Sequence, residues 1–267
     1  MKSVPSVPSV PSVPSVLPGP RVPPRPSAQP RCRAVIFDWG GTLTPWHSFD
    51  LQEQWQVFAR QVHTEEEQAL SLAARLLSAE EAAWTRSRTD HSSARLHEIL
   101  MAAGFDERDL RREAALAAYQ KFWEPHTFTD EQVRPLWEGL HERRIRVGVL
   151  SNTIWSGDYH RAVFERDGVL DLIDADVYSS ELAWTKPHPQ AFLAAAAAVG
   201  VRSSEAVYVG DRPFEDIHGS QLAGMRAIWV PHSQIPAAQQ VSVDVTPDGV
   251  AHELLDILDI IDGWQPR

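Results

Sequence analysis

The sequence predicts an α/β protein with a parallel β-sheet core and an α-helical domain inserted after the first strand. In the second half of the chain, short apolar runs alternate with helical stretches, as in parallel sheets whose strands are joined by helices. The first two apolar runs are instead separated by more than a hundred residues of almost continuous helical pattern. The insertion is therefore expected to form a unit of its own.

Five short β-like runs are the predicted strands: residues 34–37, 146–150, 176–179, 206–209 and 227–230. The stretches PQAFLAAAAAVG and FEDIHGSQLAGM, which separate the last three runs, are helical in period and close at glycine. A last helix is expected around GVAHELLDILDIID. This alternation predicts a Rossmann-like parallel sheet.

Four consecutive helical stretches fill the interval between the first two strands: LQEQWQVFARQVH, EEEQALSLAARLLSAEEAAW, SARLHEILMAAGF and ERDLRREAALAAYQKFW. A separate helical cap explains four consecutive helices better than a crossover connection does. We therefore assign residues 46–129 to an α-helical cap domain and residues 31–45 and 130–267 to the α/β core.

The first 30 residues stand apart from this pattern. Ser-Val-Pro repeats from residue 3 to residue 16, and ten of the chain's 20 prolines lie in residues 1–30. Proline fixes φ and removes a backbone donor, so we expect an extended, disordered tail outside the fold. A docking segment for a proline-reading partner is the alternative.

Composition limits the function classes. No apolar run approaches the roughly 20 residues of a transmembrane helix, and proline interrupts the N-terminus, where a secretory signal needs an apolar core. A single cysteine, Cys32, suits a reducing compartment. A net charge of −11 argues against non-specific nucleic-acid binding. We expect a cytoplasmic protein with no nucleic-acid or membrane partner; the oligomeric state is left open.

Polar residues follow four of the predicted strands. Asp38 ends the first, Ser151 and Asn152 follow the second, Lys186 lies in the loop after the third, and Asp211 follows the fourth. Ligands of open parallel sheets bind beyond the carboxyl ends of the strands, so these side chains are expected on one rim. Each alone also fits an ordinary turn. The lysine stands out because the chain has only three lysines and otherwise uses arginine.

Four motifs occur in order along the chain: VIFDWGGTLT, VGVLSNT, LAWTKPHPQAF and VYVGDRPFEDIHGSQLAGM. With this order and spacing, from about residue 33 to residue 230, the sequence resembles the haloacid dehalogenase-like hydrolase superfamily. The resemblance is to the phosphatase-like branch with a helical cap after the first strand.

The resemblance implies a nucleophile and a phosphate cradle. Asp38 would attack phosphorus to give an aspartyl-phosphate, and Lys186 would be the second catalytic residue, supplying a fixed positive charge. The implied phosphate-binding set is Trp39, Gly40, Ser151, Asn152 and Lys186. Glycine after the nucleophile lets backbone N–H groups approach phosphate oxygens. The structural alternatives are that Trp39 packs on the sheet and that Asn152 orients its loop.

The resemblance also implies Mg²⁺, a hard cation that prefers oxygen ligands. Its expected ligands are Asp38, the main-chain carbonyl of Gly40, Asp211 and Asp216. The last of these matches a position that in relatives orients the lysine or a metal-bound water. A carboxylate favoured by a helix N-terminus is the alternative for Asp216.

Gly40 departs from the commonest phosphatase form of the first motif, which has a second aspartate there. That aspartate protonates the leaving group and then activates water, a contribution of about 10²–10⁴-fold. Three replacements are open: His47, which titrates near neutrality; a substrate with a good leaving group, such as a sugar 1-phosphate or an acyl phosphate; or metal-bound water.

The stretch AAWTRSRTDHSS, between the second and third predicted cap helices, offers Trp84, Arg86 and Arg88 as substrate contacts. Arginine pairs well with a phosphate or carboxylate, and tryptophan stacks on a sugar or base. A solvent-exposed helix end is the alternative.

These inferences favour a Mg²⁺-dependent phosphomonoesterase that acts on a small phosphorylated metabolite. The pair Asp211 and Asp216 argues against metal-free dehalogenation. Ser151 is not in a G-x-S-x-G elbow, and the histidines show no zinc-like spacing with the lone cysteine. The alternative function is a catalytically weak or inactive relative that binds a phosphorylated ligand or a protein partner.

Overall fold

The computed structural model describes residues 30–45, 51–106, 108–231 and 241–264 of the chain. The candidate acid His47 and almost all of the proline-rich tail lie outside these residues. The expectations for both stay predictions.

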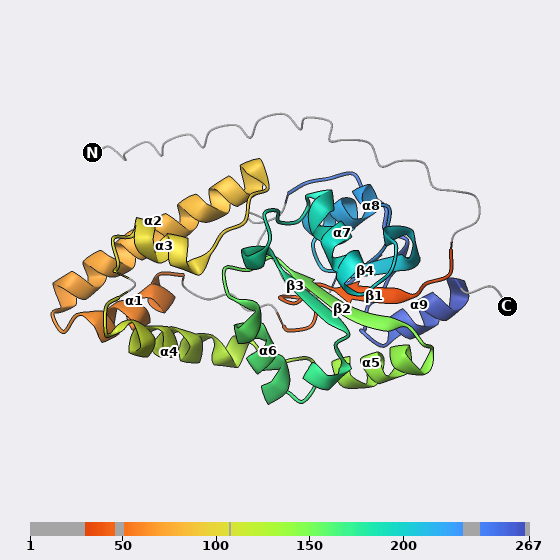
Figure 1. The fold of residues 1–267 in the computed structure, drawn as a ribbon, viewed down its shortest axis with the longest axis horizontal. Coiled ribbons are helices and arrows are strands. Elements are labelled where there is room, and N and C mark those ends of the chain that lie inside the picture. The colour runs from red at the N-terminus through yellow and green to blue at the C-terminus, as the bar shows by residue number, and fades with distance from the viewer. Residues whose placement is uncertain (1–29, 46–50, 107, 232–240, 265–267) are drawn as a thin grey trace, which may run out of the picture.

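The described residues form one sheet of six parallel strands in the order β3-β2-β1-β4-β5-β6 (Figure 1). The strands are β1 (Ala34–Phe37), β2 (Arg146–Ser151), β3 (Ala175–Tyr178), β4 (Ala206–Gly210), β5 (Arg226–Trp229) and β6 (Gly249–Val250). The first five match the predicted runs to within one residue at each end, and the short β6 was not predicted. The predicted α/β fold class is confirmed.

Alternate side chains of the central strand enter two different cores. Val35 and Phe37 lie in one hydrophobic cluster, with residues of α5 and α9, whereas Ala34 and Ile36 lie in another, with residues of α7. The core helices are α5 (Val133–Glu142), α6 (Gly157–Arg166), α7 (Pro189–Ala198), α8 (Gly219–Leu222) and α9 (Asp256–Trp264). Because strand side chains alternate between faces, an all-apolar strand requires cover on both sides. Figure 1 shows α7 and α8 on one side of the sheet and α5 and α9 on the other.

The insertion after β1 is a helical unit with its own core. It contains α1 (Leu51–Val62), α2 (Glu66–Asp90), α3 (Leu96–Ala102) and α4 (Arg112–Trp123), which are grouped beside the sheet in Figure 1. Trp55, Phe58 and Leu76 are buried in a cluster separate from the two that flank the sheet. The four helices lie within the predicted cap, whose limits at residues 46 and 129 stay a prediction.

The connection between α2 and α3 joins the helical unit to two loops of the core. The backbone N–H of Leu96 donates to the carbonyl of Ile154, after β2, and the N–H of Thr185 donates to the carbonyl of His91. The guanidinium of Arg95 donates to the carbonyls of Ser180 and Leu182. The helical unit therefore contacts the same loops that carry Ser151 and Lys186.

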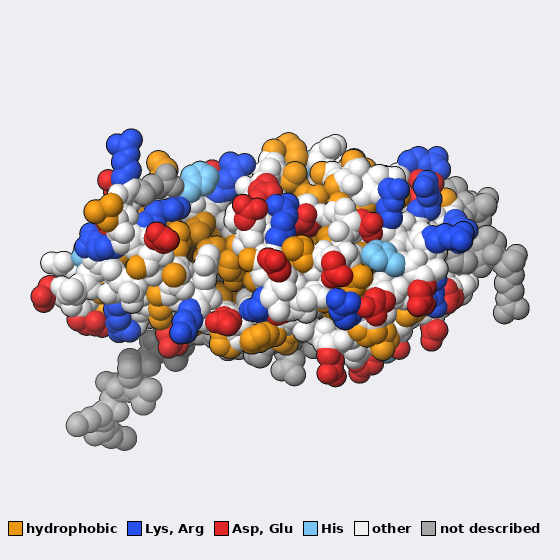
Figure 2. All heavy atoms as spheres, turned by 60° about the horizontal axis from the view of Figure 1, so that its bottom comes forward, with side chains coloured by type: hydrophobic (Ala, Val, Ile, Leu, Met, Phe, Trp, Pro, Cys, Tyr) orange, Lys and Arg blue, Asp and Glu red, His pale blue; other side chains and the backbone are white. Residues whose placement is uncertain are grey.

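The remaining described elements are short helices: η1 (Glu124–His126), η2 (Leu170–Leu172), η3 (Ser179–Glu181), η4 (Ser203–Glu205) and the π-helical η5 (Pro213–His218). Figure 2 shows acidic and basic side chains interspersed over the face that includes α5, α6 and α9. No helix among the described residues combines the length and apolarity that crossing a membrane requires.

Candidate active site

Asp38 stands at the carboxyl end of the central strand. Its backbone N–H donates to the carbonyl of Val209 at 2.9 Å, which continues the pairing of β1 with β4. The next residues form a tight turn in which the carbonyl of Trp39 accepts from the N–H groups of Leu43 and Thr44. The side chain of Asp38 is buried, with the residue 5% exposed. The fold therefore holds a carboxylate in a fixed position at the sheet rim.

Lys186 links the strand ends through its ammonium group. Its Nζ donates to Asp38 Oδ1 at 2.7 Å, to Asp216 Oδ1 at 2.7 Å and to the hydroxyl of Tyr208 at 2.9 Å. An ammonium has three N–H donors, so these three acceptors use all of them. The hydroxyl of Tyr208 in turn donates to the carbonyl of Leu150 at 2.9 Å. The predicted pair Asp38 and Lys186 is thus brought into direct contact.

The loop that carries Lys186 is fixed by Asn152. The side-chain amide of Asn152 donates to the carbonyl of Lys186 at 3.0 Å, and its Oδ1 accepts from the N–H of Lys186 at 2.9 Å. This reciprocal pair joins the loop after β2 to the loop after β3. Ser151, the last residue of β2, is buried beside it. The geometry supports the loop-orienting interpretation of Asn152.

Electrostatics keep the lysine charged. Burial alone lowers the pKa of Lys186, but the carboxylates of Asp216 and Asp38 outweigh it, so the pKa lies above its ordinary value. Burial raises the pKa of Asp38, and the neighbouring Asp216 adds to the rise, whereas Lys186 opposes it. The ammonium group of Lys186 therefore stabilises the ionised forms of these buried carboxylates.

Three carboxylates converge at the rim. One oxygen from each of Asp38, Asp211 and Asp216 lies within 4.8 Å of the others, and all three residues are buried. The ammonium group of Lys186 bonds two of the three carboxylates, those of Asp38 and Asp216. Buried like charges require compensation. The set of three oxygen donors fits a hard divalent cation such as Mg²⁺.

Asp216 is held from two directions at the start of η5. Its Oδ1 accepts from Lys186 and its Oδ2 accepts from the N–H of Arg212 at 2.9 Å. A Cβ at Gly210 would lie 2.4 Å from the Asp216 carboxyl carbon, so glycine is needed for this close approach. Both interpretations of Asp216 from the sequence, the lysine-orienting one and the helix-start one, describe contacts that it makes.

Trp39 packs into the core beneath the turn. Its indole ring lies edge-on to His160, with ring centroids 4.5 Å apart, and packs against the cluster beside α5 and α9. His160 is in turn stacked on Tyr178, with centroids 4.5 Å apart. The side chain of Trp39 therefore packs against the core next to the turn that follows Asp38, in agreement with the packing alternative.

Trp84, Arg86 and Arg88 lie inside α2, because this helix continues to Asp90 instead of ending near residue 84. The expected connecting stretch therefore begins only after Asp90. The indole N–H of Trp84 donates to Glu80 Oε1 at 3.3 Å, within the helical unit. Arg86 and Arg88 are exposed. The structure thus places Trp84 against the core of the helical unit and leaves its role in substrate binding a prediction.

Two residues of the site escaped the sequence analysis. Tyr208 completes the coordination of the lysine ammonium, and His160 supports Trp39. Tyr208 bonds Lys186, which lies 22 positions away, and His160 contacts the ring of Trp39. Because both partners are distant in the sequence, no local sequence pattern marks either residue. The one available hint was a tyrosine with a polar tip inside the otherwise aliphatic strand AVYVG.

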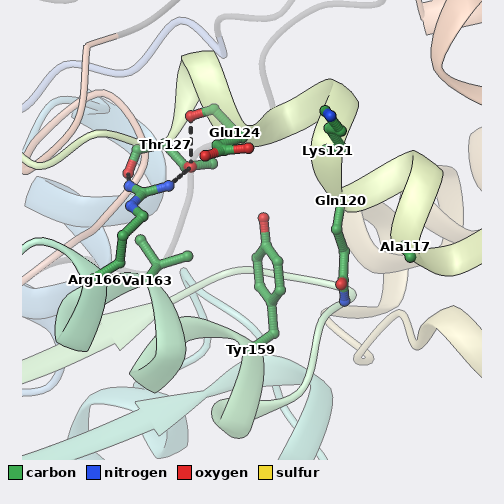
Figure 3. Close-up of a pocket in the computed structure, with 8 residues that line it drawn as sticks. All are labelled: Ala117, Gln120, Lys121, Glu124, Thr127, Tyr159, Val163 and Arg166. Atoms are coloured by element: carbon green, nitrogen blue, oxygen red, sulfur yellow. Dashed lines mark hydrogen bonds between the residues drawn. The ribbon is translucent and has the colours of Figure 1, made fainter.

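A concavity lies between α4 of the helical unit and α6 of the core. Figure 3 shows the hydroxyl of Tyr159 pointing into it, and Arg166 hydrogen-bonded to Thr127. Its volume is about 340 Å³, and its lining residues are Ala117, Gln120, Lys121, Glu124, Thr127, Tyr159, Val163 and Arg166. None of these is a predicted site residue.

Comparison with known proteins places the chain among hydrolases. A family model described as haloacid dehalogenase-like hydrolase matches residues 32–224. A glyceraldehyde 3-phosphate phosphatase of Methanopyrus kandleri is 28% identical over 165 residues, which are 61% of this chain and 69% of that protein. A phosphoserine phosphatase of Thermus thermophilus is 33% identical over 103 residues, 39% of this chain and 41% of that protein.

The same fold occurs in solved structures. A 2-haloacid dehalogenase from Pseudomonas syringae superimposes with a TM-score of 0.60 and 25% sequence identity, covering 88% of this chain and all of that one. The likeness therefore extends over the sheet and the helical unit together.

The buried His160 predicts a pH dependence of stability. Burial lowers the pKa of His160 to about 3, whereas an unfolded histidine titrates near about 6.5. Between these values the unfolded chain binds the extra proton, so the free energy of unfolding falls as pH decreases, by up to about 1.4 kcal/mol per pH unit. Urea unfolding from pH 6.5 to pH 4 should show a smaller fall for His160→Phe than for the wild type. His97→Gln, at an exposed histidine, is the control; equal slopes for wild type and His160→Phe would contradict the prediction.

Proposed function

This chain belongs to the haloacid dehalogenase-like hydrolase family, and we propose that it is a Mg²⁺-dependent phosphomonoesterase acting on a small phosphorylated metabolite. The observation that carries the proposal is the contact of Asp38 with the Lys186 ammonium inside a cluster of three buried carboxylates. Two relatives named as phosphatases support the same reaction class. Because these two matches cover only part of the chain, the substrates of the relatives are not assigned to it.

In this proposal Asp38 is the nucleophile. A carboxylate oxygen of Asp38 bonds to phosphorus and forms an aspartyl-phosphate, which water then hydrolyses. Lys186 stabilises negative charge on the transferred group from a position that Asp216 and Asn152 fix. Ser151 and the backbone N–H groups of the turn at Gly40 complete the phosphate cradle. Asp216 acts through the lysine and is a positioning residue.

The cofactor in this proposal is Mg²⁺. Asp38, Asp211 and Asp216, with the main-chain carbonyl of Gly40, would hold the cation. When bound, it neutralises charge on the phosphoryl oxygens. The support is the donor chemistry of the cluster, in which three buried carboxylates lie close together and one ammonium group bonds two of them.

Phosphoryl transfer fits this cluster better than dehalogenation, although a similar solved structure is a 2-haloacid dehalogenase. A haloacid anion entering the site would meet Asp211 and Asp216 as well as the nucleophile, and like charges in a buried place repel strongly. A phosphate accompanied by a divalent cation has no such difficulty. The helical unit would close over the rim and select the substrate, with Trp84, Arg86 and Arg88 as the proposed contacts.

Asp38→Asn tests the proposed nucleophile. We expect phosphate release from a panel of sugar, amino-acid and aryl phosphates to fall by about 10³-fold or more, because a neutral amide is a poor nucleophile. Asp171→Asn, at an exposed carboxylate, should retain wild-type turnover. Activity that survived the loss of Asp38 would exclude this function.

Metal binding has a readout independent of turnover. Mg²⁺ should raise the midpoint of thermal unfolding, because at 100 times its dissociation constant a ligand stabilises the folded state by about 2.7 kcal/mol. Asp211→Asn should lose most of this shift, whereas Asp171→Asn should keep it, with NaCl of matched ionic strength as the blank. An equal shift in both variants would show that Mg²⁺ binds elsewhere.

A further inference from the structure

Gly40 leaves open space on the turn that presents the nucleophile. Apart from its two chain neighbours, no atom of the described residues lies within 4 Å of a Cβ placed at this position, and the backbone there is outside the left-handed region. The neighbouring Gly41 differs, because its φ of 85° favours glycine. Among the described residues, position 40 therefore has room for a Cβ and does not need the backbone freedom of glycine, yet it carries no side chain.

The ammonium group bonded to Asp38 has no N–H group left over. The three N–H donors of Lys186 are all used by Asp38, Asp216 and Tyr208. Transfer of one of these protons to a leaving group would leave two buried carboxylates facing a neutral amine. Because opposite charges stabilise one another strongly at low dielectric, this transfer is unfavourable.

The partners of the lysine are equally committed. The hydroxyl of Tyr208 donates to the carbonyl of Leu150 and is fully buried. Both carboxylate oxygens of Asp216 accept hydrogen bonds, one from Lys186 and one from Arg212. Within this hydrogen-bonded group of described residues, every proton is engaged by another protein atom.

We propose that the substrates are activated phosphates, whose leaving group departs as a stable anion without a proton from the protein. The chemical class comprises acyl phosphates, phosphoanhydrides and esters of acidic hydroxyls. This inference rests on the proposed function and narrows it, because ordinary alkyl phosphates release a strongly basic alkoxide.

The chemical steps balance without an enzyme acid. An oxygen of Asp38 bonds to phosphorus while the bond from phosphorus to the leaving oxygen breaks, and the electron pair departs with that oxygen as a carboxylate, phosphate or phenolate. Water then bonds to phosphorus as Asp38 leaves with its electron pair. The oxygen and both protons of the water end in inorganic phosphate, H₂PO₄⁻.

The wild-type protein provides the first test. We expect kcat/KM, which reports transfer of the phosphoryl group to the enzyme, to be at least about 10²-fold higher for 4-nitrophenyl phosphate and acetyl phosphate than for glycerol 3-phosphate. The scale is that of a missing general acid. A difference below about tenfold would overturn the inference.

Gly40→Asp and Gly40→Asn form the matched second test. Aspartate adds a proton donor in the open space, so the ratio of kcat/KM for 4-nitrophenyl phosphate to that for glycerol 3-phosphate should shrink by about 10²–10⁴-fold. Asparagine has nearly the same shape and no acidic proton, so it should leave the ratio high. A ratio that shrinks equally in both variants, or in neither, would contradict the inference.

Two further variants locate any acid outside this group. His47→Asn and Glu215→Gln replace a histidine beyond the described residues and a carboxyl beside Asp216. The ratio of kcat/KM for 4-nitrophenyl phosphate to that for glycerol 3-phosphate should not rise in either variant. A rise of about tenfold or more would show that the replaced residue supplies the proton and would overturn the inference. Asp38→Asn separates the two proposals. If this variant loses all turnover while the wild type shows a ratio below about tenfold, the proposed function stands and only this inference is overturned.

Discussion

The ammonium group of Lys186 is the interaction on which the rest of the site depends. It is buried, and its three donors are satisfied by two carboxylates and a tyrosine hydroxyl from three different segments. Removal of the Lys186 ammonium group would leave Asp38 and Asp216 as uncompensated buried charges. This would destabilise the fold far more than the loss of an ordinary hydrogen bond. The positions of β1, β4 and η5 relative to one another are thus fixed at the rim by one charge.

The surrounding structure supports that charge. Asn152 holds the lysine backbone, Gly210 allows the approach of Asp216, and Tyr208 anchors the ammonium to the carbonyl of Leu150 in β2. The rim gathers three buried carboxylates, two of which are bonded to one ammonium group. Such a site is ready for a cation and an anionic substrate together. The same demand for compensation explains why Lys186 itself cannot serve as a proton donor.

The sequence predicted the sheet and the rim well because both follow from short-range patterns. A short, mostly apolar run is typical of a buried parallel strand. The topology of such a sheet brings the ends of its strands, and with them Asp38, Ser151 and Asp211, to one edge. The helix boundary near Trp84 was wrong for a local reason. Thr85 and Thr89 lie inside α2, where their hydroxyls donate to carbonyls one turn earlier, and the helix ends only where His91 adopts a left-handed conformation. Tyr208, His160 and the space at Gly40 were beyond prediction, since each depends on atoms brought together from distant segments.

The proposed reaction depends above all on Asp38 receiving the phosphoryl group. An acid quench during turnover of acetyl phosphate, followed by borohydride reduction, converts an aspartyl-phosphate to homoserine, which mass spectrometry locates in the peptide that contains VIFDWGGTLT. The account predicts homoserine at position 38 and at no other aspartate. Turnover without any reduced residue at position 38, or with the label at another carboxylate, would contradict it.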